Sequence, residues 1–186
     1  EGLSDGGVLP VVKHFPGHGS ADSDSHVGRS VGPPLAQLNE SDLVPFKAAI
    51  SSKKIAVMVG HIEVPDLTDG LPSSLSKAAI DGLLRNDLGF DGLVVTDSLN
   101  MRSVSDRWTV DEAVVMSVAA GADLMILGKL ADVGLAFDAI DRAVHDGLIS
   151  VDRVNDAATH VLRAKNVNAC TLVGRVRGVL NTVYDW

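Results

Sequence analysis

The sequence predicts an α/β fold built on parallel strands, and two patterns carry the prediction. Four short segments are apolar on both faces, which is typical of strands buried inside a parallel sheet: residues 8–13, 55–60, 92–97 and 122–127. Helical patterns follow these segments, so a strand–helix unit repeats four times along the chain. Such an alternation forms either a doubly wound sheet or a (β/α)8 barrel.

The residues at the strand ends favour the barrel. Each apolar segment runs out into polar or small residues, namely Lys13 and His14, His61, Asp97 and Gly128. Barrel enzymes carry their active sites at this end of the strands. We therefore expect a (β/α)8 TIM-type barrel, of which this chain supplies roughly the last four βα units. A complete barrel needs about 250 residues, so the expected partner is the missing N-terminal half-barrel.

Helix ends are marked by the residue types that cap helices. Thr109 and Glu112 have the spacing of a capping box. Gly121 and Gly147 are placed to end the helices that precede them, and Ser150 is placed to begin the last helix. We assign residues 1–166 to the half-barrel. Residues 167–186 lose the helical periodicity and are assigned to a peripheral tail.

The composition indicates a globular domain and limits its partners. Of the 186 residues, 46% are hydrophobic and 22% charged. The formal net charge of −8 disfavours nucleic acid and anionic membrane surfaces, and it favours a neutral or small polar ligand. No apolar run reaches the roughly 18 residues of a membrane span. The single cysteine, Cys170, forms no internal disulfide, so the cytoplasm and the cell surface or exterior stay open.

The string KHFPGHG, residues 13–19, is the sharpest motif. Lys13 and His14 can donate hydrogen bonds to sugar hydroxyls. Pro16 and the two glycines allow a tight backbone path beside a ligand, and the Phe15–Pro16 bond is a candidate for the cis form. The plain alternative is a basic strand end followed by an ordinary turn.

A polar loop follows this motif and contains Asp24 and His26. In an extended segment, side chains two residues apart point the same way. A carboxylate beside an imidazole fixes its tautomer and stabilises its charged form, which would make His26 a proton donor. The alternative is a solvated surface loop.

Asp97 ends the third apolar segment. An ionised carboxylate there could attack an anomeric carbon or stabilise positive charge on it, and the alternative is the N-cap of a following helix. His61 could line the sugar site or pack beneath it. His14, His18 and His26 do not form a compact ligand set on one element, so neither a metal nor another cofactor is expected.

The strings KHFPGHG, DSH, VMVGH and LVVTDSL occur in this order, and with them the chain resembles family-three glycoside hydrolases of the β-N-acetylglucosaminidase (β-N-acetylhexosaminidase) branch. The resemblance covers residues 9–165. PSSLS at 72–76 and AGADLMIL at 120–127 are also similar to that branch.

The resemblance implies a retaining hydrolase that removes terminal β-linked N-acetylglucosamine from peptidoglycan fragments or related oligosaccharides, such as those of chitin. Asp97 would form a covalent glycosyl-enzyme, and His26 would be the acid/base. Asp24 would orient His26. Lys13 and His14 match the branch's substrate-binding pair, and His61 would line the same site.

Three alternatives stay open. A histidine donor is neutral after it gives up its proton, so phosphate could replace water and give a phosphorylase. The chain could also be a catalytically incomplete carbohydrate-binding fragment, or a metal-dependent hydrolase. In the family, an aspartate and arginines from earlier strands also hold the substrate, so we expect the isolated chain to be weakly active or inactive. The glycine- and serine-rich loop suggests that His26 swings in when substrate binds.

Overall fold

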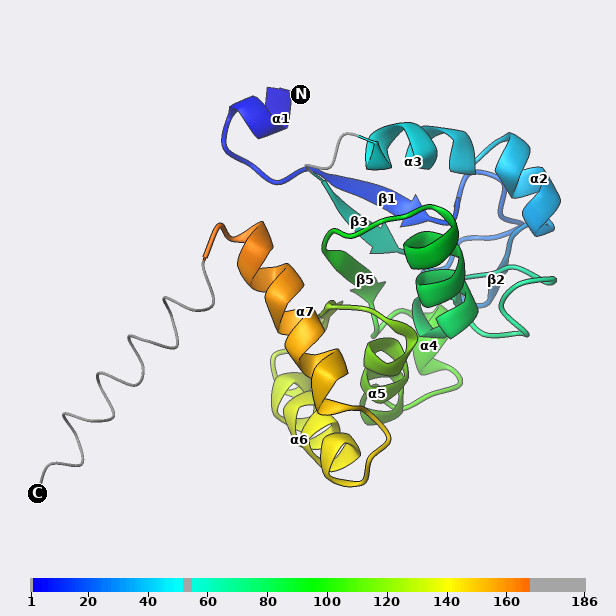
Figure 1. Cartoon of the computed structure of the whole chain (residues 1–186). Coiled ribbons are helices and arrows are strands. Elements are labelled where there is room, and N and C mark those ends of the chain that lie inside the picture. The colour runs from blue at the N-terminus through cyan, green and yellow to red at the C-terminus, as the bar shows by residue number, and fades with distance from the viewer. Residues whose placement is uncertain (1, 52–54, 168–186) are drawn as a thin grey trace, which may run out of the picture.

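The computed structural model describes residues 2–51 and 55–167, and its centre is one sheet of four parallel strands. The strands are β1 (Val11–Phe15), β3 (Ala56–Val59), β5 (Val94–Ser98) and β6 (Leu124–Ile126), and they neighbour one another in chain order (Figure 1). Each strand begins inside one of the four predicted segments. The predicted α/β class is therefore confirmed, and the open sheet has the strand order of part of a barrel.

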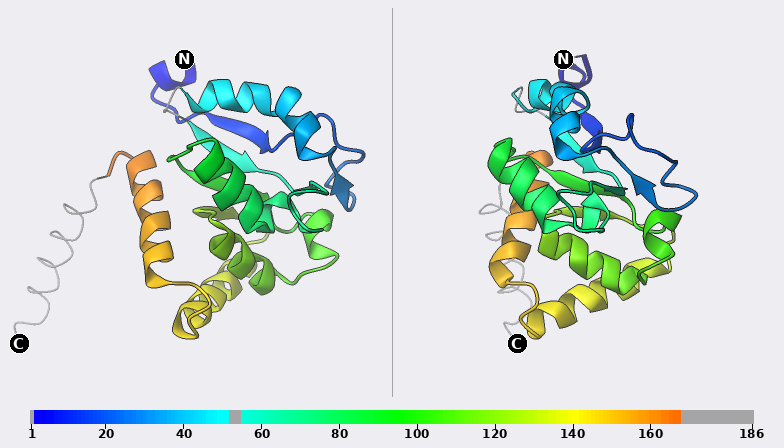
Figure 2. Two further views of the ribbon diagram at one scale, coloured as in Figure 1. Left: turned by 45° about the vertical axis from the view of Figure 1, so that its right-hand side comes forward. Right: turned by 90° about the vertical axis from the view of Figure 1, so that its right-hand side faces the viewer.

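The longer helices come between and after the strands, as the sequence predicts. They are α3 (Leu43–Ile50), η2 (Ala78–Asp87), α5 (Val110–Ala120), α6 (Asp132–His145) and α7 (Val151–Ala164). Figure 2 shows the helices passing around the sheet in chain order, from α3 through η2 to α5 and α6. No helix among the described residues is long and apolar enough to cross a membrane.

The shorter elements were not predicted, because they are only two to six residues long. They are α1 (Gly2–Asp5), α2 (Leu35–Glu40), η1 (Ser73–Leu75), α4 (Arg102–Ser105) and the strands β2 (Ser30–Val31) and β4 (Ile62–Glu63). β2 and β4 pair in parallel as a separate small sheet. This small sheet lies next in sequence to two predicted site residues, because β2 follows the loop of His26 and β4 follows His61.

The main core fills the space between the strands and the helices α3 and η2. Phe15 and Phe46 meet edge to face with ring centroids 5.4 Å apart, and Val57, Ile80 and Leu84 are fully buried in the same cluster. Burying one such side chain stabilises the fold by roughly 1.5–3 kcal/mol. Because Phe15 ends β1, this cluster fixes the strand that carries Lys13 and His14.

The predicted helix caps are confirmed. The Glu112 carboxylate accepts hydrogen bonds from the Thr109 backbone N–H and hydroxyl, at 2.9 and 2.8 Å. Gly121 ends α5 in the left-handed region with a φ of 114°. The Ser150 hydroxyl accepts from the Arg153 N–H and begins α7.

The two outer strands leave apolar side chains exposed. Val11 on β1 is 44% exposed and Leu124 on β6 is 43% exposed. Each outer strand has one strand neighbour among the described residues. These edges are where the remaining strands of a barrel would pair. The predicted tail lies outside the described residues except for Val167.

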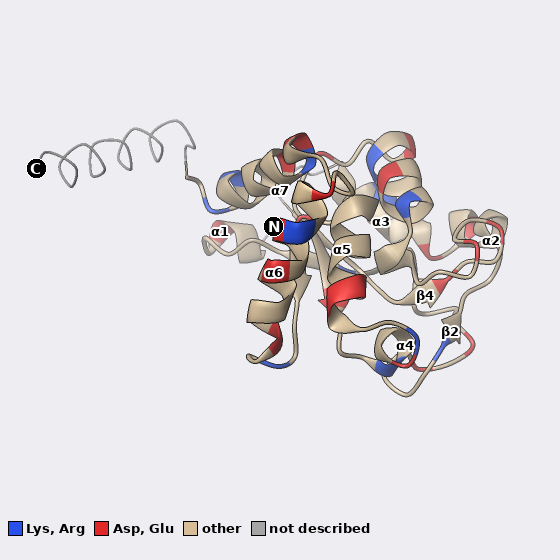
Figure 3. Ribbon diagram, turned by 90° about the horizontal axis from the view of Figure 1, so that it is seen from below, with Lys and Arg blue, Asp and Glu red and all other residues tan. Residues whose placement is uncertain are grey.

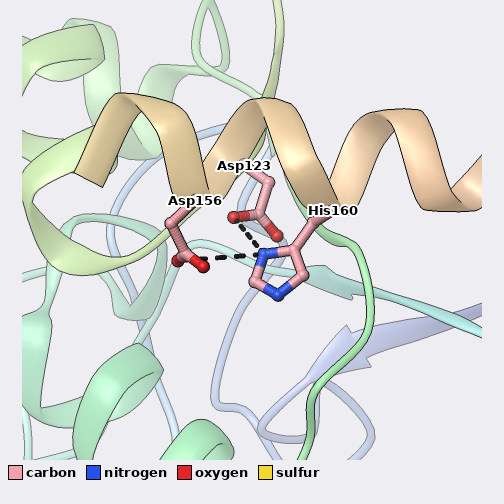
Figure 4. Close-up of side chains that lie close together, drawn as sticks. All are labelled: Asp123, Asp156 and His160. Carbon is pink, nitrogen blue, oxygen red and sulfur yellow. Dashed lines mark hydrogen bonds and ion pairs between the residues drawn. The ribbon is translucent and has the colours of Figure 1, made fainter. Parts of the chain in front are cut away.

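A buried carboxylate ties α7 to the sheet. The side chain of Asp123, just before β6, has no exposed surface. It accepts hydrogen bonds from Arg85 Nη2 at 2.7 Å, Arg153 Nη2 at 2.5 Å and His160 Nδ1 at 3.1 Å. Figure 4 shows the His160 ring turned towards Asp123. Both Arg153 and His160 belong to α7, so these bonds fix the last helix.

This arrangement predicts a pH-dependent stability. The hydrogen bond and charge of Asp123 raise the pKa of His160 above its usual value of about 6.5. The stabilisation is therefore complete below about pH 6.5 and is lost as the pH rises through the folded-state pKa. The difference in urea midpoint between the wild type and His160→Gln should be largest near pH 6 and shrink towards about pH 9.

His145→Gln, at the exposed end of α6, is the matched control and should give a small difference at every pH. A wild-type advantage over His160→Gln that stays constant or grows with pH would contradict this account.

Candidate active site

The candidate active site lies at the carboxyl ends of the strands, where β1 and β5 each contribute a side chain. His14 of β1 and Asp97 of β5 face each other, with 3.6 Å between His14 Nε2 and Asp97 Oδ2. Their side chains are 27% and 18% exposed. Both side chains are therefore partly covered and still reach solvent.

Asp97 does not occupy the N-cap position of the helix that follows it. Its Oδ1 accepts the backbone N–H of Ser98 at 2.8 Å, whereas the N-cap of α4 is Met101. The oxygen that faces His14 is the other one, Oδ2. The helix boundary thus does not match the interpretation of Asp97 as an N-cap. Its carboxylate is instead held in a defined orientation near the carboxyl end of β5.

The His14 ring is held towards its neutral form. Burial lowers the pKa of His14, and this effect outweighs the opposing influence of Asp97. The positive charges of Lys13, His18 and His26 lower it further. A neutral imidazole can donate one hydrogen bond and accept another, so it suits a sugar hydroxyl.

His61 follows β3 and lies under the site. Only 1% of its surface is exposed. Its Nε2 donates to the Ser98 carbonyl at 2.9 Å, and Nδ1, as the acceptor of that tautomer, lies 2.7 Å from the Ser74 hydroxyl. Burial lowers its pKa. Because both ring nitrogens are bonded within the protein, the position matches the second of the two roles considered for His61, packing beneath the site.

The predicted Asp24–His26 pair is present on an exposed loop. His26 Nδ1 lies 2.7 Å from Asp24 Oδ1, which also accepts the His26 backbone N–H at 2.9 Å. These two bonds, the backbone one first, lower the pKa of Asp24. The side chains of His26 and Asp24 are 70% and 61% exposed. Nδ1 is thus engaged by the carboxylate, and Nε2 is the nitrogen left for proton transfer.

The loop of His26 is bonded to α4, which follows β5, because the Ser25 carbonyl accepts the Ser103 N–H at 3.3 Å. A charge on His26 lowers the pKa of both His14 and His61, which flank Asp97. The residue before it, Ser25, is 1% exposed, and its hydroxyl lies 2.9 Å from His18 Nε2. The buried Ser25 therefore anchors this loop. Ser25 was not predicted, because a serine in a polar loop gives no sign of burial.

The KHFPGHG backbone adopts the unusual path that its glycines and proline suggest. The Phe15–Pro16 bond, which the sequence marked as a candidate for the cis form, is cis. The Lys13–His14 bond is cis as well. Gly17 has a φ of 146°, and a Cβ there would lie 2.2 Å from the Cβ of Asp42. Lys13 is exposed on β1. The motif thus carries Lys13 and His14 on a backbone that only glycine permits at position 17.

A second group of polar side chains lies at the opposite, amino end of the strands. Asp123, Asp156 and His160 place one potential ligand atom each within 4.8 Å of one another, and they are the one such group among the described residues (Figure 4). Asp123 already accepts hydrogen bonds from the guanidinium groups of Arg85 and Arg153. Two neighbouring positive charges oppose the binding of a cation, so this cluster is better suited to fastening α7.

Parallel strands with a carboxylate and histidines at their carboxyl ends are typical of domains of the α/β-barrel class. Residues 1–164 match the family model described as "Glycosyl hydrolase family 3 N terminal domain". The chain belongs to glycosyl hydrolase family 3.

Proteins similar to this chain include bacterial hydrolases and a phosphorylase. The β-hexosaminidase LpqI of Mycobacterium tuberculosis is 42% identical over 174 residues, which are 90% of this chain and 45% of LpqI. The solved LpqI structure superposes with a TM-score of 0.86, covering 90% of this chain and 50% of that one. The structure of a family 3 β-N-acetylglucosaminidase from Paenibacillus sp. is 39% identical, with a TM-score of 0.85. The match covers 89% of this chain and 32% of that one.

The structure of the β-glucoside phosphorylase BglX is also similar, at 28% identity and a TM-score of 0.81. The match covers 88% of this chain and 31% of that one. The chain spans about half the length of the curated hexosaminidases that it matches. The matched part of these proteins therefore belongs to the family 3 N-terminal domain.

The tight contact at Gly17 predicts a large effect of one methyl group. Gly17→Ala would place its Cβ against Asp42 at a backbone angle that suits glycine, so we expect the free energy of unfolding to fall by about 1–3 kcal/mol. Gly134→Ala, in α6 with nothing within 4 Å of its Cβ, should change it little or raise it by up to about 1 kcal/mol. Urea denaturation of both variants checks this, and equal stability of the two would contradict it.

Proposed function

We propose that this chain carries the catalytic groups of a retaining β-N-acetylhexosaminidase, with Asp97 as nucleophile and His26 as acid/base. The observation that carries the proposal is the partly covered Asp97 facing His14, together with the Asp24–His26 pair on the loop that follows the motif of His14. Membership of family 3 and the names of the hexosaminidase relatives support the reaction class.

In the first step, an oxygen of Asp97 attacks the anomeric carbon of the bound sugar. The bond from that carbon to the leaving oxygen breaks, and protonated His26 gives its Nε2 proton to this oxygen. The products are a glycosyl ester on Asp97 and a neutral histidine. Asp24 stabilises the charged ring before the transfer, since it lies 2.7 Å from Nδ1.

In the second step, water attacks the same carbon from the other face. Neutral His26 takes the proton from the water, the ester bond to Asp97 breaks, and the β configuration is retained. Lys13 and His14 bind hydroxyls of the sugar in both steps. His61 supports the site from below, because its bond to the Ser98 carbonyl holds the backbone next to Asp97.

The substrate class is terminal β-linked N-acetylglucosamine on peptidoglycan fragments or related oligosaccharides. Part of the binding energy that orients the sugar must come from the rest of the barrel, because β1 and β6 each have a strand neighbour on one side only among the residues that the structure describes. We therefore propose that an N-terminal half-barrel completes the site.

A phosphorylase is the second candidate. A histidine acid/base carries no negative charge after the first step, so it would not repel a phosphate anion as a carboxylate would. The similarity to the phosphorylase BglX is the observation that favours it. The two reactions share the ester on Asp97 and differ only in the acceptor.

The proposal predicts the behaviour of a split enzyme. A chromogenic β-N-acetylglucosaminide should be cleaved slowly or not at all by the isolated chain, and much faster after a family 3 N-terminal half-barrel is added. Asp97→Ala should abolish this activity, and His26→Ala should lower it by roughly 10²–10⁴-fold. Initial rates of chromophore release measure both effects.

Asp152→Ala, on the exposed side of α7, is a control and should keep full activity. Activity that survives Asp97→Ala would rule out the assigned nucleophile. Formation of N-acetylglucosamine 1-phosphate in phosphate buffer would show that the reaction is phosphorolysis and not hydrolysis.

A further inference from the structure

Glu63 is a buried carboxylate to which the proposed mechanism gives no role. It ends β4, and its side chain is only 4% exposed. Oε2 accepts hydrogen bonds from Arg29 Nε at 2.9 Å and Nη2 at 2.7 Å, while Oε1 accepts from Arg107 Nη1 at 2.7 Å. A buried charge is costly to desolvate and persists only with such partners. Glu63 is therefore fixed in place by two cations.

The two arginines belong to the two segments that carry the chemistry. Arg29 closely follows His26 in the acid/base loop and immediately precedes β2, which pairs with β4. Arg107 follows α4, in the segment after Asp97, and it also donates to the Gly70 carbonyl at 3.0 Å. One carboxylate thus joins the loop of the acid/base to the segment that follows the nucleophile.

Arg107 is itself held in a defined position. Its guanidinium carbon lies 4.2 Å from the centroid of the Trp108 ring, which adds a cation–π contact to the hydrogen bonds. Figure 3 shows β2, β4 and α4 at one edge of the molecule, with basic and acidic positions close together. The buried Glu63 carboxylate therefore connects the loop of His26 to the segment after α4, through arginine side chains that are 63% and 41% exposed.

The loop has a second anchor on the other side of His26. The Ser25 carbonyl accepts the Ser103 N–H at 3.3 Å, and the Ser25 hydroxyl lies beside His18. At the base of the loop, the Asp22 carboxylate accepts the Val31 N–H at 2.8 Å. The exposed pair Asp24 and His26 thus extends from a loop that is fastened before and after it.

We propose that Glu63 is a positioning residue for the acid/base His26. It binds Arg29 of the loop and Arg107 of the segment after α4, and these two contacts hold the loop in place. The inference rests on the proposed function of His26. Both oxygens of Glu63 are used, and hydrogen bonds between charged groups are about twice as strong as neutral ones. The expected swing of His26 is then confined to the tip of the loop between the two anchors.

The inference predicts a loss that depends on the leaving group. Glu63→Gln removes the charge but keeps the shape, so His26 should lose alignment with the leaving oxygen. Misplacement by about 1 Å can cost up to about 10²-fold in rate. We expect kcat/KM to fall at least about 10-fold for a chitobiose-type substrate, which needs a proton, and less than about 3-fold for a dinitrophenyl glycoside, which does not.

The matched control is Asp123→Asn, which alters a buried carboxylate that is also held by two arginines but lies at the other end of the strands. Asp123→Asn should change kcat/KM by the same factor for both substrates. Equal losses for the two substrates in Glu63→Gln, or no loss in either, would overturn the positioning role. Both assays use the chain together with the half-barrel that restores activity.

A second measurement uses the 186-residue chain alone and requires no catalysis. Amide hydrogen exchange across residues 22–31 should be faster in Glu63→Gln than in the wild type, and unchanged there in Asp123→Asn. Unchanged exchange in Glu63→Gln would overturn the anchor itself. Hydrolysis that persists in Asp97→Ala would instead overturn the proposed function, while faster exchange would still support the anchor.

Discussion

The constraint on which the site depends is the register of the parallel strands. Val57 of β3 pairs with Val12 of β1 on one side and with Val94 of β5 on the other. This alignment brings the carboxyl ends of the strands to one edge, so that His14 and Asp97 meet although β3 lies between their strands. A shift of one residue would turn these side chains to the other face of the sheet.

The proposed catalytic and binding groups differ in exposure. Asp97 and His14 belong to strands and are partly covered, and His61 is buried beneath them. The Asp24–His26 pair is exposed on a loop. In the proposed reaction, a partly covered nucleophile and a more accessible acid/base suit the two steps, because His26 must first protonate the leaving oxygen and then deprotonate the attacking water.

Much of this could be read from the sequence because the signals are local. The doubly apolar segments, the Thr109–Glu112 capping box and the closely spaced Asp24 and His26 each involve neighbouring residues. The role of His61 could not be decided, because its partner Ser98 lies 37 residues away. Glu63 was missed for the same reason, since Arg29 and Arg107 are 34 and 44 residues from it.

The most direct test of the central claim is covalent trapping of the nucleophile. The chain, completed by its half-barrel, is incubated with a fluorinated N-acetylglucosaminyl fluoride, which forms the glycosyl ester but slows its hydrolysis, and the peptides are then analysed by mass spectrometry. The account predicts one added sugar on the peptide that contains Asp97. A sugar attached to a different residue, or no adduct in a preparation that hydrolyses the chromogenic substrate, would contradict it.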